Sequence, residues 1–401
     1  MIKRTLQELC LNITDGKHGD CENEENSGYY FISCKDIFDG QINYKNARQI
    51  TKADFEETHK RTMLEVDDIL LTNSGTIGRM AFVTDREATT KTTFQKSVAI
   101  IKPDKQNVLP RYLYYQLQNC VPQFINSSNG SAQKNLLLST MRTFQIEIEE
   151  NREKQEKIAN TLSAYDDLIE NNQKQIKLLE EAAQRLYKEW FVDLRFPGHE
   201  NTKIVDGVPE GWSIYPFSSK VDIMSGGTPK TSIPDYYNGK IPFYTPKDND
   251  GAFFAYKTQM NITEGGLKNC NSRLYPPKTV IITARGTVGK TTILAVPMAM
   301  NQSCYALKMK ENDAPYYLFF ALDNEIKALQ TMANGGVFNT IIGKTFDSIN
   351  IQIPKDPLIY GFEETVRPFM EQIKNKLQAN SKLVEARDRL LPKLMSGEVK
   401  V

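Results

Sequence analysis

An internal repeat spans almost the whole 401-residue chain and restricts the folds that the chain can adopt. The clearest match pairs DILLTNSGTIGRMAFV, residues 68–83, with TVIITARGTVGKTTIL, residues 279–294. Within this match Gly75 aligns with Gly286. A repeat of this length predicts a fold that contains two copies of one structural unit.

Other matches follow in the same order in both halves, and the distance between aligned residues shortens slowly, as differences in loop length would cause. Any one match would be weak, but their common order indicates a duplication. The aligned pairs are Phe31 with Phe243, Lys35-Asp36 with Lys247-Asp248, Gln95 with Gln302, Ala99 with Ala306, Pro110 with Pro315, Leu117 with Leu322, Asn129-Gly130 with Asn334-Gly335, and Phe144 with Ile349.

Short apolar runs alternate with turn residues in each copy. ILLT at 69–72 lies between two aspartates and a glycine turn, which predicts a buried strand, and SVAIIKP at 97–103 ends another strand at a proline. Residues 110–119 are apolar at helical spacing, and the alternation in FQIEI at 144–148 predicts a half-buried strand. We therefore expect an α+β fold with two mixed α/β domains related by internal duplication.

A heptad pattern follows each domain. Apolar residues recur at alternating spacings of four and three over residues 158–190, where neither Gly nor Pro occurs. A second seam with this spacing lies near the C-terminus, and we expect Pro368 and Pro392 to bound its regular part, with earlier residues in a first turn or a kink. The seam positions are Ile158, Leu162, Tyr165, Ile169, Asn172, Ile176, Leu179, Leu186, Phe369, Ile373, Asn380, Leu383 and Leu390.

Two seams, one after each repeated domain, favour pairing of the two helices as an antiparallel coiled coil, although each helix could instead pack only on its own domain. An end-for-end symmetric register places Asn172 against Asn380, where a buried amide pair would fix the register at some loss of stability. A helix of about 35 residues is roughly 50 Å long, so the pair would hold the two domains at a fixed distance.

These patterns divide the chain into five segments. Between the halves, RFPGHENTKIVDGVPEGW is rich in Gly, Pro and polar residues, which predicts a linker. The segments are a first α/β domain at 1–150, a first long helix at 151–194, the linker at 195–212, a second α/β domain at 213–355 and a second long helix at 356–401.

The composition argues against several classes of protein. No run approaches the ~20 apolar residues of a membrane span, and the start, MIKRTLQELC, lacks the apolar core of a signal peptide, so we expect a cytoplasmic protein. The six cysteines form no CxxC pair and the three histidines are dispersed, which argues against disulfides and metal sites. Because the net charge is only +1, a nucleic-acid function needs local basic clusters or partners that supply phosphate contacts.

Two similar domains on a rigid spacer suit a linear target with two separated half-sites. DNA is such a target, with half-sites about 34–36 Å apart for one helical turn. Because the two copies share their strands and differ in their loops, we expect each domain to read a different short sequence.

Local sequence patterns agree with this interpretation. VPEGW at 208–212 opens the second domain, while NITDGKHGD at 12–20 and SGGTPKTSIPDYYNGKIPFYTPKD at 225–248 lie near the start of the two copies. QEKIANTLSAYDDLIENNQKQIKLLEEAAQRLYKEWF at 155–191 and KLVEARDRLLPKLMSGEV at 382–399 form the helical regions. With these motifs, in the order domain–helix–domain–helix, the whole chain resembles the specificity subunit of type I restriction-modification systems.

The resemblance implies a division of labour among subunits. Each α/β domain would be a target-recognition domain that reads one half of a bipartite DNA site through the major groove. The paired helices would set the spacing and dock two DNA methyltransferase subunits, and restriction/translocase subunits would join that core. The chain itself would catalyse nothing, since adenine methylation with S-adenosylmethionine belongs to the partner.

Base-specific contacts require Arg, Lys, Asn or Gln, helped by Ser and Thr, while Lys and backbone amides contact phosphate. Any such loop residue is either a DNA contact or simply solvated. The repeated Lys-Asp pair could instead be the end of a strand. The glycine turns either contact phosphate or only shape the domain. The candidate contacts are Lys17, His18, Lys35, Asn73, Ser74, Thr76, Arg79, Lys91, Thr92, Lys96, Lys134, Asn135, Thr228, Lys230, Thr231, Lys247, Asp248, Arg285, Thr287, Lys290 and Asn339.

Two other functions remain alternatives. ARGTVGKT at 284–291 is one residue away from the phosphate-binding P-loop GxxxxGK[ST], which would suggest a nucleotide-binding enzyme. Against this, Ala284 replaces the first glycine, the other copy lacks the Lys-Thr end, and TTILAVP continues as a strand where a P-loop would open a helix. The second alternative is a scaffold whose repeated domains bind proteins or sugars.

Overall fold

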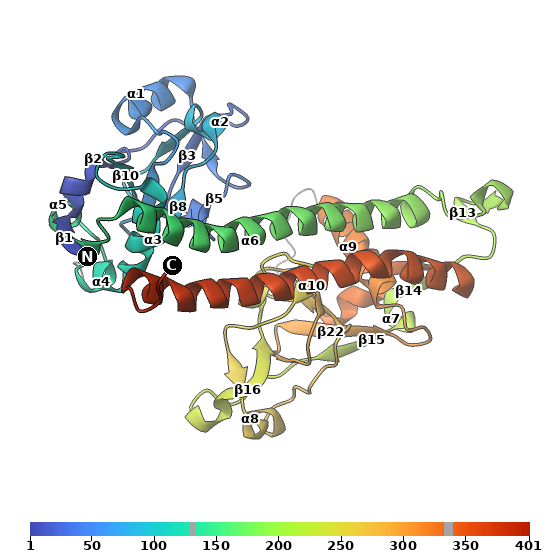
Figure 1. The fold of residues 1–401 in the computed structure, drawn as a ribbon. Helices are drawn as coiled ribbons and strands as arrows, with labels where there is room; N and C mark the ends of the chain where they lie inside the picture. The colour runs from blue at the N-terminus through green and yellow to red at the C-terminus, as the bar shows by residue number, and fades with distance from the viewer. Residues whose placement is uncertain (129–133, 333–339) are drawn as a thin grey trace. The chain divides into compact units, whose positions relative to one another are not determined.

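The computed structural model describes residues 1–128, 134–332 and 340–401 (Figure 1). These residues form two compact units: unit 1 contains Met1–Leu168 and Leu383–Val401, and unit 2 contains Ile169–Lys382. Each unit therefore holds one mixed α/β domain together with part of both long helices. Among the described residues, no helix has the length and apolar character of a membrane span.

The domain of unit 1 is built on a four-stranded antiparallel sheet. Its strands, in spatial order, are β2 (Cys10–Asp15), β10 (Val98–Pro103), β7 (Ile69–Thr72) and β8 (Met80–Phe82). Smaller sheets join β6 (Arg48–Gln49), β3 (Tyr30–Ile32) and β9 (Thr92–Phe94); β1 (Ile2–Thr5) and β11 (Gln145–Ile148); and β4 (Ile37–Phe38) and β5 (Gln41–Ile42). The helices are α1 (Lys52–Thr62), α2 (Arg86–Thr89), α3 (Pro110–Asn119), α4 (Val121–Asn126) and α5 (Leu138–Thr143), with 3-10 turns at Leu6–Leu9 and Cys34–Asp36.

The main sheet of unit 1 is covered on both faces. Ile69 and Leu71 pack with Leu113 of α3 in one core cluster, while Leu70 packs with Ile32 in another. A strand buried on both sides needs a continuous apolar run, which explains ILLT in β7. Figure 1 shows α3 beside the long helices and α1 on the other side of the sheet.

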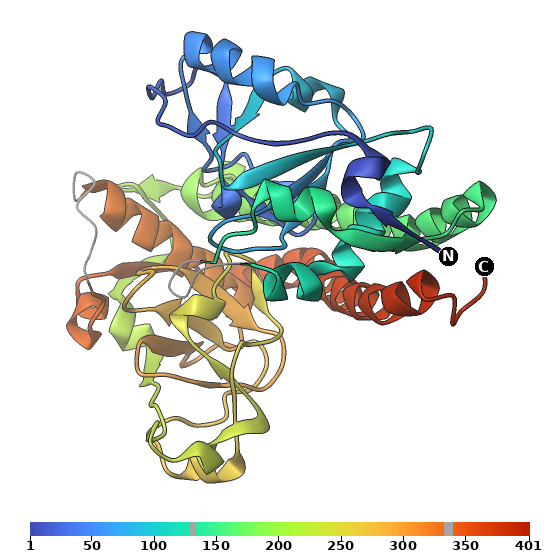
Figure 2. The same cartoon turned by 90° about the vertical axis from the view of Figure 1, so that its left-hand side faces the viewer.

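The domain of unit 2 repeats this plan. Its main sheet has the order β15 (Val221–Ser225), β22 (Cys304–Met309), β19 (Val280–Thr283), β20 (Thr291–Leu294) and β17 (Phe254–Ala255). Smaller sheets join β18 (Asn261–Ile262), β16 (Tyr237–Tyr244) and β21 (Ala299–Met300); β14 (Ser213–Pro216) and β23 (Asn350–Ile353); and β12 (Ile204–Val205) and β13 (Val208–Pro209). The helices are α7 (Phe217–Lys220), α8 (Glu264–Lys268) and α9 (Pro315–Met332), with 3-10 turns at His199–Asn201, Pro234–Tyr236, Pro246–Asp248 and Gly343–Asp347. Figures 1 and 2 both show α9 beside the long helices and α8 at the far end of the domain.

Strand register corrects one part of the sequence alignment. Ala99 pairs with Leu71 in unit 1, and Tyr305 pairs with Ile282 at the matching place in unit 2. Ala99 therefore corresponds to Tyr305 and not to Ala306, and by the same shift Gln95 corresponds to Asn301 and Lys96 to Gln302. Matching identical residues pairs Ala99 with Ala306, whereas the hydrogen-bonding register of the sheet determines which residues are equivalent. A shift of one residue exchanges the two faces of a strand.

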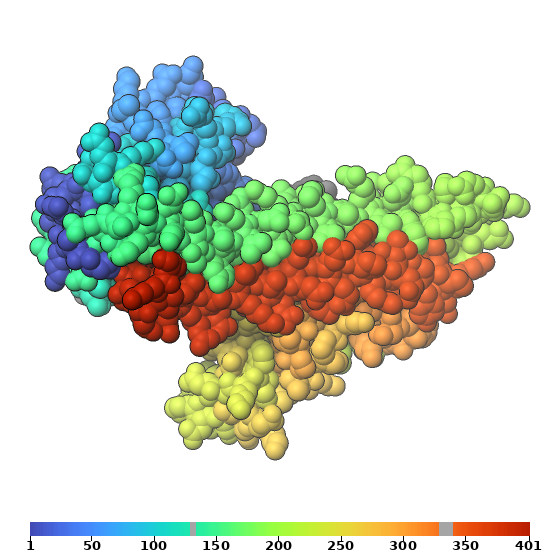
Figure 3. Space-filling model, viewed as in Figure 1, coloured from blue at the N-terminus to red at the C-terminus, as the bar shows by residue number. Residues whose placement is uncertain are grey.

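The long helices are α6 (Arg152–Tyr187), which ends in a π-helical turn at Lys188–Val192, and α10 (Asp356–Met395). In unit 2 they are antiparallel: Asn172 Nδ2 donates to Asn380 Oδ1 at 2.8 Å, and further along the pair the rings of Trp190 and Phe362 lie 5.9 Å apart. The heptad register predicted this pairing of Asn172 with Asn380. Figure 3 shows the side chains of α6 and α10 in contact.

Unit 1 contains the other ends of the same two helices. Arg387 Nη1 lies 2.6 Å from Asp166 Oδ1, and the Tyr115 hydroxyl of α3 donates to the other carboxylate oxygen of Asp166 at 2.5 Å. Ile158 and Leu162 share a core cluster with Leu391 and Leu394 of α10. All the predicted seam residues are buried or half-buried in the structure: Ile158, Leu162, Tyr165, Ile169, Asn172, Ile176, Leu179, Leu186, Phe369, Ile373, Asn380, Leu383 and Leu390.

The second helix begins at residue 356 as expected, but the two prolines do not bound its regular part, because α10 runs without interruption through Pro368 and Pro392. A proline inside a helix removes one backbone hydrogen bond and costs about 3 kcal/mol. Here Phe362 and Val366, in the turns before Pro368, are fully buried in the core of unit 2. Burying each of two such side chains contributes about 1.5–3 kcal/mol, which is enough to hold the segment in the helix.

Candidate nucleic-acid interface

Several candidate residues lie in loops at one edge of the main sheet of unit 1. Asp15, Ala99, Leu71 and Met80 form one row across the four strands. Three segments leave the sheet beyond this row: the loop after β2, the turn between β7 and β8, and the loop before β10. We call them the first loop (16–20), the glycine turn (73–79) and the third loop (95–97).

Unit 2 has the same edge. Ser225, Tyr305, Ile282 and Thr291 form the corresponding row, so the first loop is 226–231, the glycine turn is 284–290 and the third loop is 301–303. In each unit, these three segments together form what we call the loop edge.

A buried threonine holds each glycine turn in the same way. Thr72 Oγ1 accepts from the backbone N–H of Arg79 at 2.9 Å, and Thr283 Oγ1 accepts from that of Lys290 at 3.1 Å. The backbone oxygens of both threonines also accept from the second glycine of the turn. Sequence reasoning had missed these threonines, although both end an aligned strand in the two copies and could have been found there.

The glycines are needed for the shape of the turn. Gly75 and Gly78 have φ angles of 78° and 94°, and Gly286 and Gly289 have φ angles of 80° and 83°. This left-handed region is strained for most residues with a Cβ atom, so all four positions strongly favour glycine whatever the turn binds.

A 3-10 turn that carries the repeated Lys-Asp pair packs beside each glycine turn; we call it the Lys-Asp turn (Cys34–Asp36 and Pro246–Asp248). In unit 1, Cys34 N donates to Ser97 Oγ of the third loop at 3.1 Å. In unit 2, Thr287 Oγ1 donates to the Pro246 carbonyl at 3.3 Å. Each Lys-Asp turn therefore belongs to its loop edge.

The two residues of the Lys-Asp pair have different roles. Asp36 Oδ2 accepts from both the backbone N and the Oγ of Ser33 at 2.8 and 2.7 Å, and Asp248 does the same with Thr245 at the same distances. These carboxylates cap 3-10 turns, whereas the sequence had suggested either a DNA contact or a strand end for the Lys-Asp pair. The lysines beside them, Lys35 and Lys247, are exposed.

The loop edge of unit 1 brings together many of the predicted residues. Lys35, Thr76, Arg79 and Lys96 are exposed there and Ser74 is half-buried. Lys134 and Asn135 adjoin the glycine turn, because Ser74 forms a β-bridge with Asn135.

Lys17 and His18 also lie on this edge, but each already contacts an acidic group. Lys17 Nζ is 3.0 Å from Asp54 and 3.2 Å from Glu57, and the hydrogen bond to Asp54 raises the pKa of Lys17 to about 12. His18 Nε2 lies 2.8 Å from the buried carboxylate of Asp15.

Three candidates of unit 1 do not fit a direct contact. Asn73 is 4% exposed and Thr92 is fully buried, so neither side chain reaches the surface, and both assignments need correction. Lys91 directly precedes β9, at the end of that strand that lies away from the loop edge, and pairs with Glu87 at 2.6 Å. For Asn73 and Thr92, sequence position indicated a loop but not the burial that tertiary packing produces.

All the described candidates of unit 2 lie on its loop edge, and most are exposed: Thr228, Lys230, Thr231, Lys247, Arg285, Thr287 and Lys290 are exposed, and Asp248 is half-buried. Asn339 lies outside the described residues. The sequence had given no reason to choose the segment 269–274, which contacts the first loop so closely that a Cβ on Gly227 would be 2.6 Å from Asn271 N. This segment adds Arg273, whose guanidinium lies 6.0 Å from the Tyr275 ring centre.

The loop edges concentrate free positive charge on a chain of almost zero net charge. Within residues 1–128, 134–332 and 340–401, no ion pair is made by Lys35, Lys96, Lys247, Arg79, Arg285 or Lys290. An exposed cation that forms no ion pair attracts anions, and a polyanion with regularly spaced charges attracts several such cations together.

The P-loop alternative is not supported. The segment 284–290 leads directly into β20, a strand of the main sheet, and not into a helix. Phosphate binding by a P-loop depends on backbone N–H groups at a helix N-terminus, which this turn does not have.

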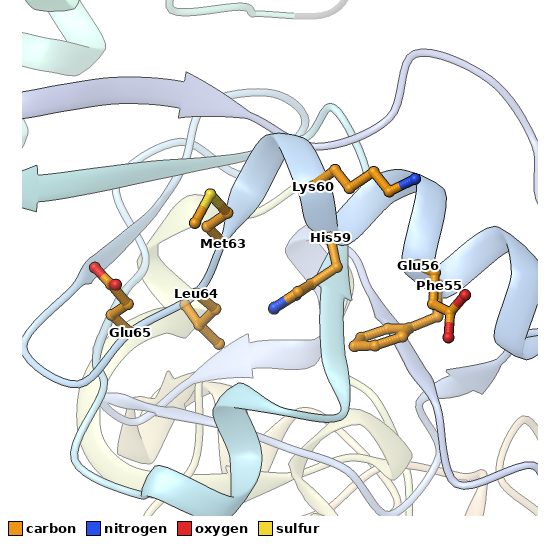
Figure 4. Close-up of a pocket in the computed structure, with 7 residues that line it drawn as sticks. All are labelled: Phe55, Glu56, His59, Lys60, Met63, Leu64 and Glu65. Atoms are coloured by element: carbon orange, nitrogen blue, oxygen red, sulfur yellow. The ribbon is translucent and has the colours of Figure 1, made fainter.

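A hollow of about 480 Å³ lies on unit 1 away from the loop edge (Figure 4). It adjoins Glu65, which pairs with Lys102 at the other end of β10. The His59 ring stacks on Phe55 with centroids 4.9 Å apart, and burial lowers the pKa of His59. Among the described residues, no carboxylate or nucleophile is bonded to this imidazole, so the hollow lacks the paired groups of acid–base catalysis. Its lining is Phe55, Glu56, His59, Lys60, Met63, Leu64 and Glu65.

Comparison with known proteins identifies relatives of the whole chain. The family model described as "Type I restriction modification DNA specificity domain" matches residues 3–181 and 209–378. The MjaIX type I restriction enzyme specificity subunit of Methanocaldococcus jannaschii is 28% identical over 383 residues, which cover 92% of this chain and 87% of that protein. The HindI specificity subunit of Haemophilus influenzae is 25% identical, covering 75% of this chain and 80% of its own.

A solved structure has a similar fold. The crystal structure of a type I restriction-modification S subunit from M. genitalium superimposes with a TM-score of 0.58 over 98% of this chain and 95% of that chain. At 17% sequence identity this match concerns the fold alone.

Proposed function

Because the chain belongs to the family of type I restriction-modification DNA specificity proteins, we propose that it reads a bipartite DNA sequence and that each unit contacts one half of it. The target-recognition domains are the two α/β domains, and the loop edge of each is the surface that enters a DNA groove. The two half-sites have different base sequences, because the two loop edges share their framework and differ in several side chains.

The duplicated loop edge is the observation that carries this proposal. The same rows of the sheet, the same threonine contacts and the same capped Lys-Asp turn support loops with unpaired cations in both units. Phosphate charge provides most of the sequence-independent affinity of a DNA-binding protein, so paired cationic edges suit a duplex.

The long helices serve as spacer and docking surface in this proposal. Both α6 and α10 contribute residues to both units, which supports a role in setting the distance between half-sites. Two DNA methyltransferase subunits dock on the helices, and restriction/translocase subunits join that core. The complex acts in the cytoplasm, where the DNA is.

Catalysis belongs to the partners in this scheme. The sequence contains no adenine-methyltransferase [DN]PP[YF] motif, since the nearest segment, YPPK at 275–278, lacks the polar first residue. S-adenosylmethionine is therefore bound by the methyltransferase subunit, and this chain supplies sequence recognition.

Selection from random duplex DNA tests the proposal. The chain in complex with its methyltransferase subunits is expected to enrich a split motif with a fixed gap. Replacing residues 1–150 with those of a relative should change one half of the motif and leave the other half and the gap unchanged. A complex that enriches no motif would refute DNA reading and favour a scaffold that binds proteins or sugars.

A further inference from the structure

The side chains at equivalent positions of the two loop edges can be compared, because both edges are proposed to bind DNA. Two half-sites of a duplex present the same phosphate backbone and different bases. Side chains that match in position and charge between the units therefore suit phosphate, and side chains that differ suit base edges. This comparison rests on the proposed function and goes beyond it by assigning separate roles to individual residues.

We propose that Arg79 and Lys290 form one equivalent pair of phosphate contacts, that Lys35 and Lys247 form a second, and that Arg285 reads a base in the second half-site. The geometry brings each glycine-turn cation onto the same edge as the Lys-Asp turn lysine of its unit. Each half-site is then held by two positive charges on a common framework.

Arg79 and Lys290 occupy the same place in the two turns. Each directly follows the second glycine, and each has its backbone N–H bonded to the buried threonine of its turn, Thr72 or Thr283. Both side chains are exposed and, in the part of the chain that the structure describes, neither forms an ion pair.

The exchange of Arg for Lys at this position is itself informative. Arg presents a planar fork that binds two acceptors at once, whereas Lys is a point charge. A phosphate accepts either group, whereas an exchange of Arg for Lys at a bidentate site changes the hydrogen-bond geometry. A position that has a positive charge in both units, but a planar guanidinium in only one, therefore suits contact with the phosphate backbone of DNA.

Lys35 and Lys247 are matched even more closely. Their turns have the same cap, with the Asp36 and Asp248 carboxylates bonded to backbone and hydroxyl groups at 2.7–2.8 Å. The capping bonds occupy the acidic neighbour, so each lysine is exposed beside an aspartate and yet has no ion pair with it in the described structure.

The position that follows Asn73 and Ala284 differs between the units. It carries Ser74 in the first glycine turn and Arg285 in the second, on backbones with the same positive-φ glycine next to them. Arg285 is exposed and has the donor geometry that reads guanine in the major groove, while the half-buried Ser74 has a short hydroxyl that is not selective.

Salt dependence separates the two roles. Full chain in complex with its methyltransferase subunits is titrated at several KCl concentrations with two duplexes, one that carries the selected motif and one of equal length with the motif scrambled. Arg79→Ala, Lys290→Ala, Lys35→Ala and Lys247→Ala should each weaken binding to both duplexes by a similar factor, roughly three- to tenfold, and reduce the slope of log affinity against log salt by about 1. Arg79→Lys and Lys290→Arg should restore both values.

Arg285→Ala should behave differently. It should weaken the motif duplex by roughly tenfold or more, leave the scrambled duplex nearly unchanged, and relax one base in the second half of a newly selected motif. Lys105→Ala is the control, because this exposed lysine pairs with Asp67 beyond the opposite end of β10 and should change neither the affinity nor the slope.

The outcomes are distinguishable. The assignment is overturned if Arg79→Ala or Lys290→Ala affects only the motif duplex and broadens the motif, since that is base reading, or if the phosphate variants leave the salt slope unchanged. Full affinity and an unchanged motif in Arg285→Ala overturn its role as a base reader. A wild-type complex that binds neither duplex refutes the proposed function itself. Since all five side chains are exposed, melting temperatures should stay unchanged and exclude misfolding.

Discussion

Thr72 and Thr283 are buried residues, yet they determine where two exposed cations lie. Each hydroxyl accepts from the backbone N–H of the residue that carries the cationic side chain of its glycine turn, Arg79 or Lys290. A buried residue can thus contribute to a binding surface through a single backbone hydrogen bond, without touching the ligand.

We expect Thr283→Val to destabilise unit 2 by about 1–3 kcal/mol, because the substitution keeps the shape of the side chain and leaves the N–H of Lys290 without its acceptor. Both tryptophans of the chain, Trp190 and Trp212, lie in unit 2, so urea unfolding followed by tryptophan fluorescence measures this effect. The exposed Thr231→Val should stay within about 0.5 kcal/mol of the wild type. Equal stabilities of the two variants would show that the hydroxyl does not hold the turn.

Glu363 makes the stability of unit 2 depend on pH. Its side chain is 4% exposed, its Oε1 accepts from Tyr317 N at 2.8 Å, and burial raises its pKa from 4.5 to about 7. Below 4.5 the group is protonated in both folded and unfolded chains. As the pH rises from 4.5 to about 7 the unfolded chain ionises first, so stability falls, and it levels off above 7.

Glu363→Gln should remove this loss, because the amide keeps an acceptor for Tyr317 N and cannot ionise. We expect the variant to be more stable than the wild type by about 1–3 kcal/mol near pH 8 and nearly equal to it near pH 4. Urea midpoints across this range, read by tryptophan fluorescence, measure the difference. A difference that does not change with pH would contradict the assignment to ionisation.

Sequence reasoning located most of the loop edge but not the state of its side chains. Alignment of the two copies was enough to find the glycine turns and the exposed Lys35 and Lys247, because those features are local and repeated. The neutralisation of Lys17 depends on Asp54 and Glu57 of α1, which are distant in sequence. The burial of Thr92 in β9 likewise depends on tertiary packing.

At the scale of single elements, the helix pair in unit 2 contains a polar pair in its seam. The Asn172 and Asn380 amides bond to each other at 2.8 Å, and Asn380 Nδ2 also reaches the Ile169 carbonyl at 3.4 Å. A polar pair at this position selects one register at a loss of stability relative to leucine.

Replacing both Asn172 and Asn380 with Leu should raise the melting temperature of unit 2, followed by tryptophan fluorescence. The single variant Asn172→Leu should lower it, since Asn380 then loses its partner in a half-buried site. A clear fall in the double variant would contradict the view that the pair provides specificity at the expense of stability.

The heptad pattern predicted both helices and their register, because a period sustained over many turns is a strong signal. The continuation of α10 through Pro368 and Pro392 could not be predicted in the same way. Proline acts on a helix locally, whereas the segment before Pro368 is held by burial of Phe362 and Val366 in the core of unit 2. Local preference and tertiary packing disagreed there, and the packing was stronger.

At the scale of the whole molecule, the spacer proposal makes a prediction about DNA. Inserting four residues, about one helical turn, into α6 beside Asn172 and a matching four into α10 beside Asn380 should lengthen the gap of the selected motif without changing either half. An insertion in the exposed hairpin between β12 and β13 is the control and should leave the gap unchanged. An unchanged gap in the helix variant would refute the spacer role.

The division of the chain into units has a consequence for its synthesis. Unit 1 contains the first residues of the chain and also its last, Leu383–Val401, whose Leu391, Leu394 and Met395 complete the core around Ile158 and Leu162. Domains usually fold as they leave the ribosome, the N-terminal one first. Here the earlier of the two α/β domains acquires its full core only after residues 383–401 have been translated, so a product truncated before them would display an unfinished apolar surface on that domain.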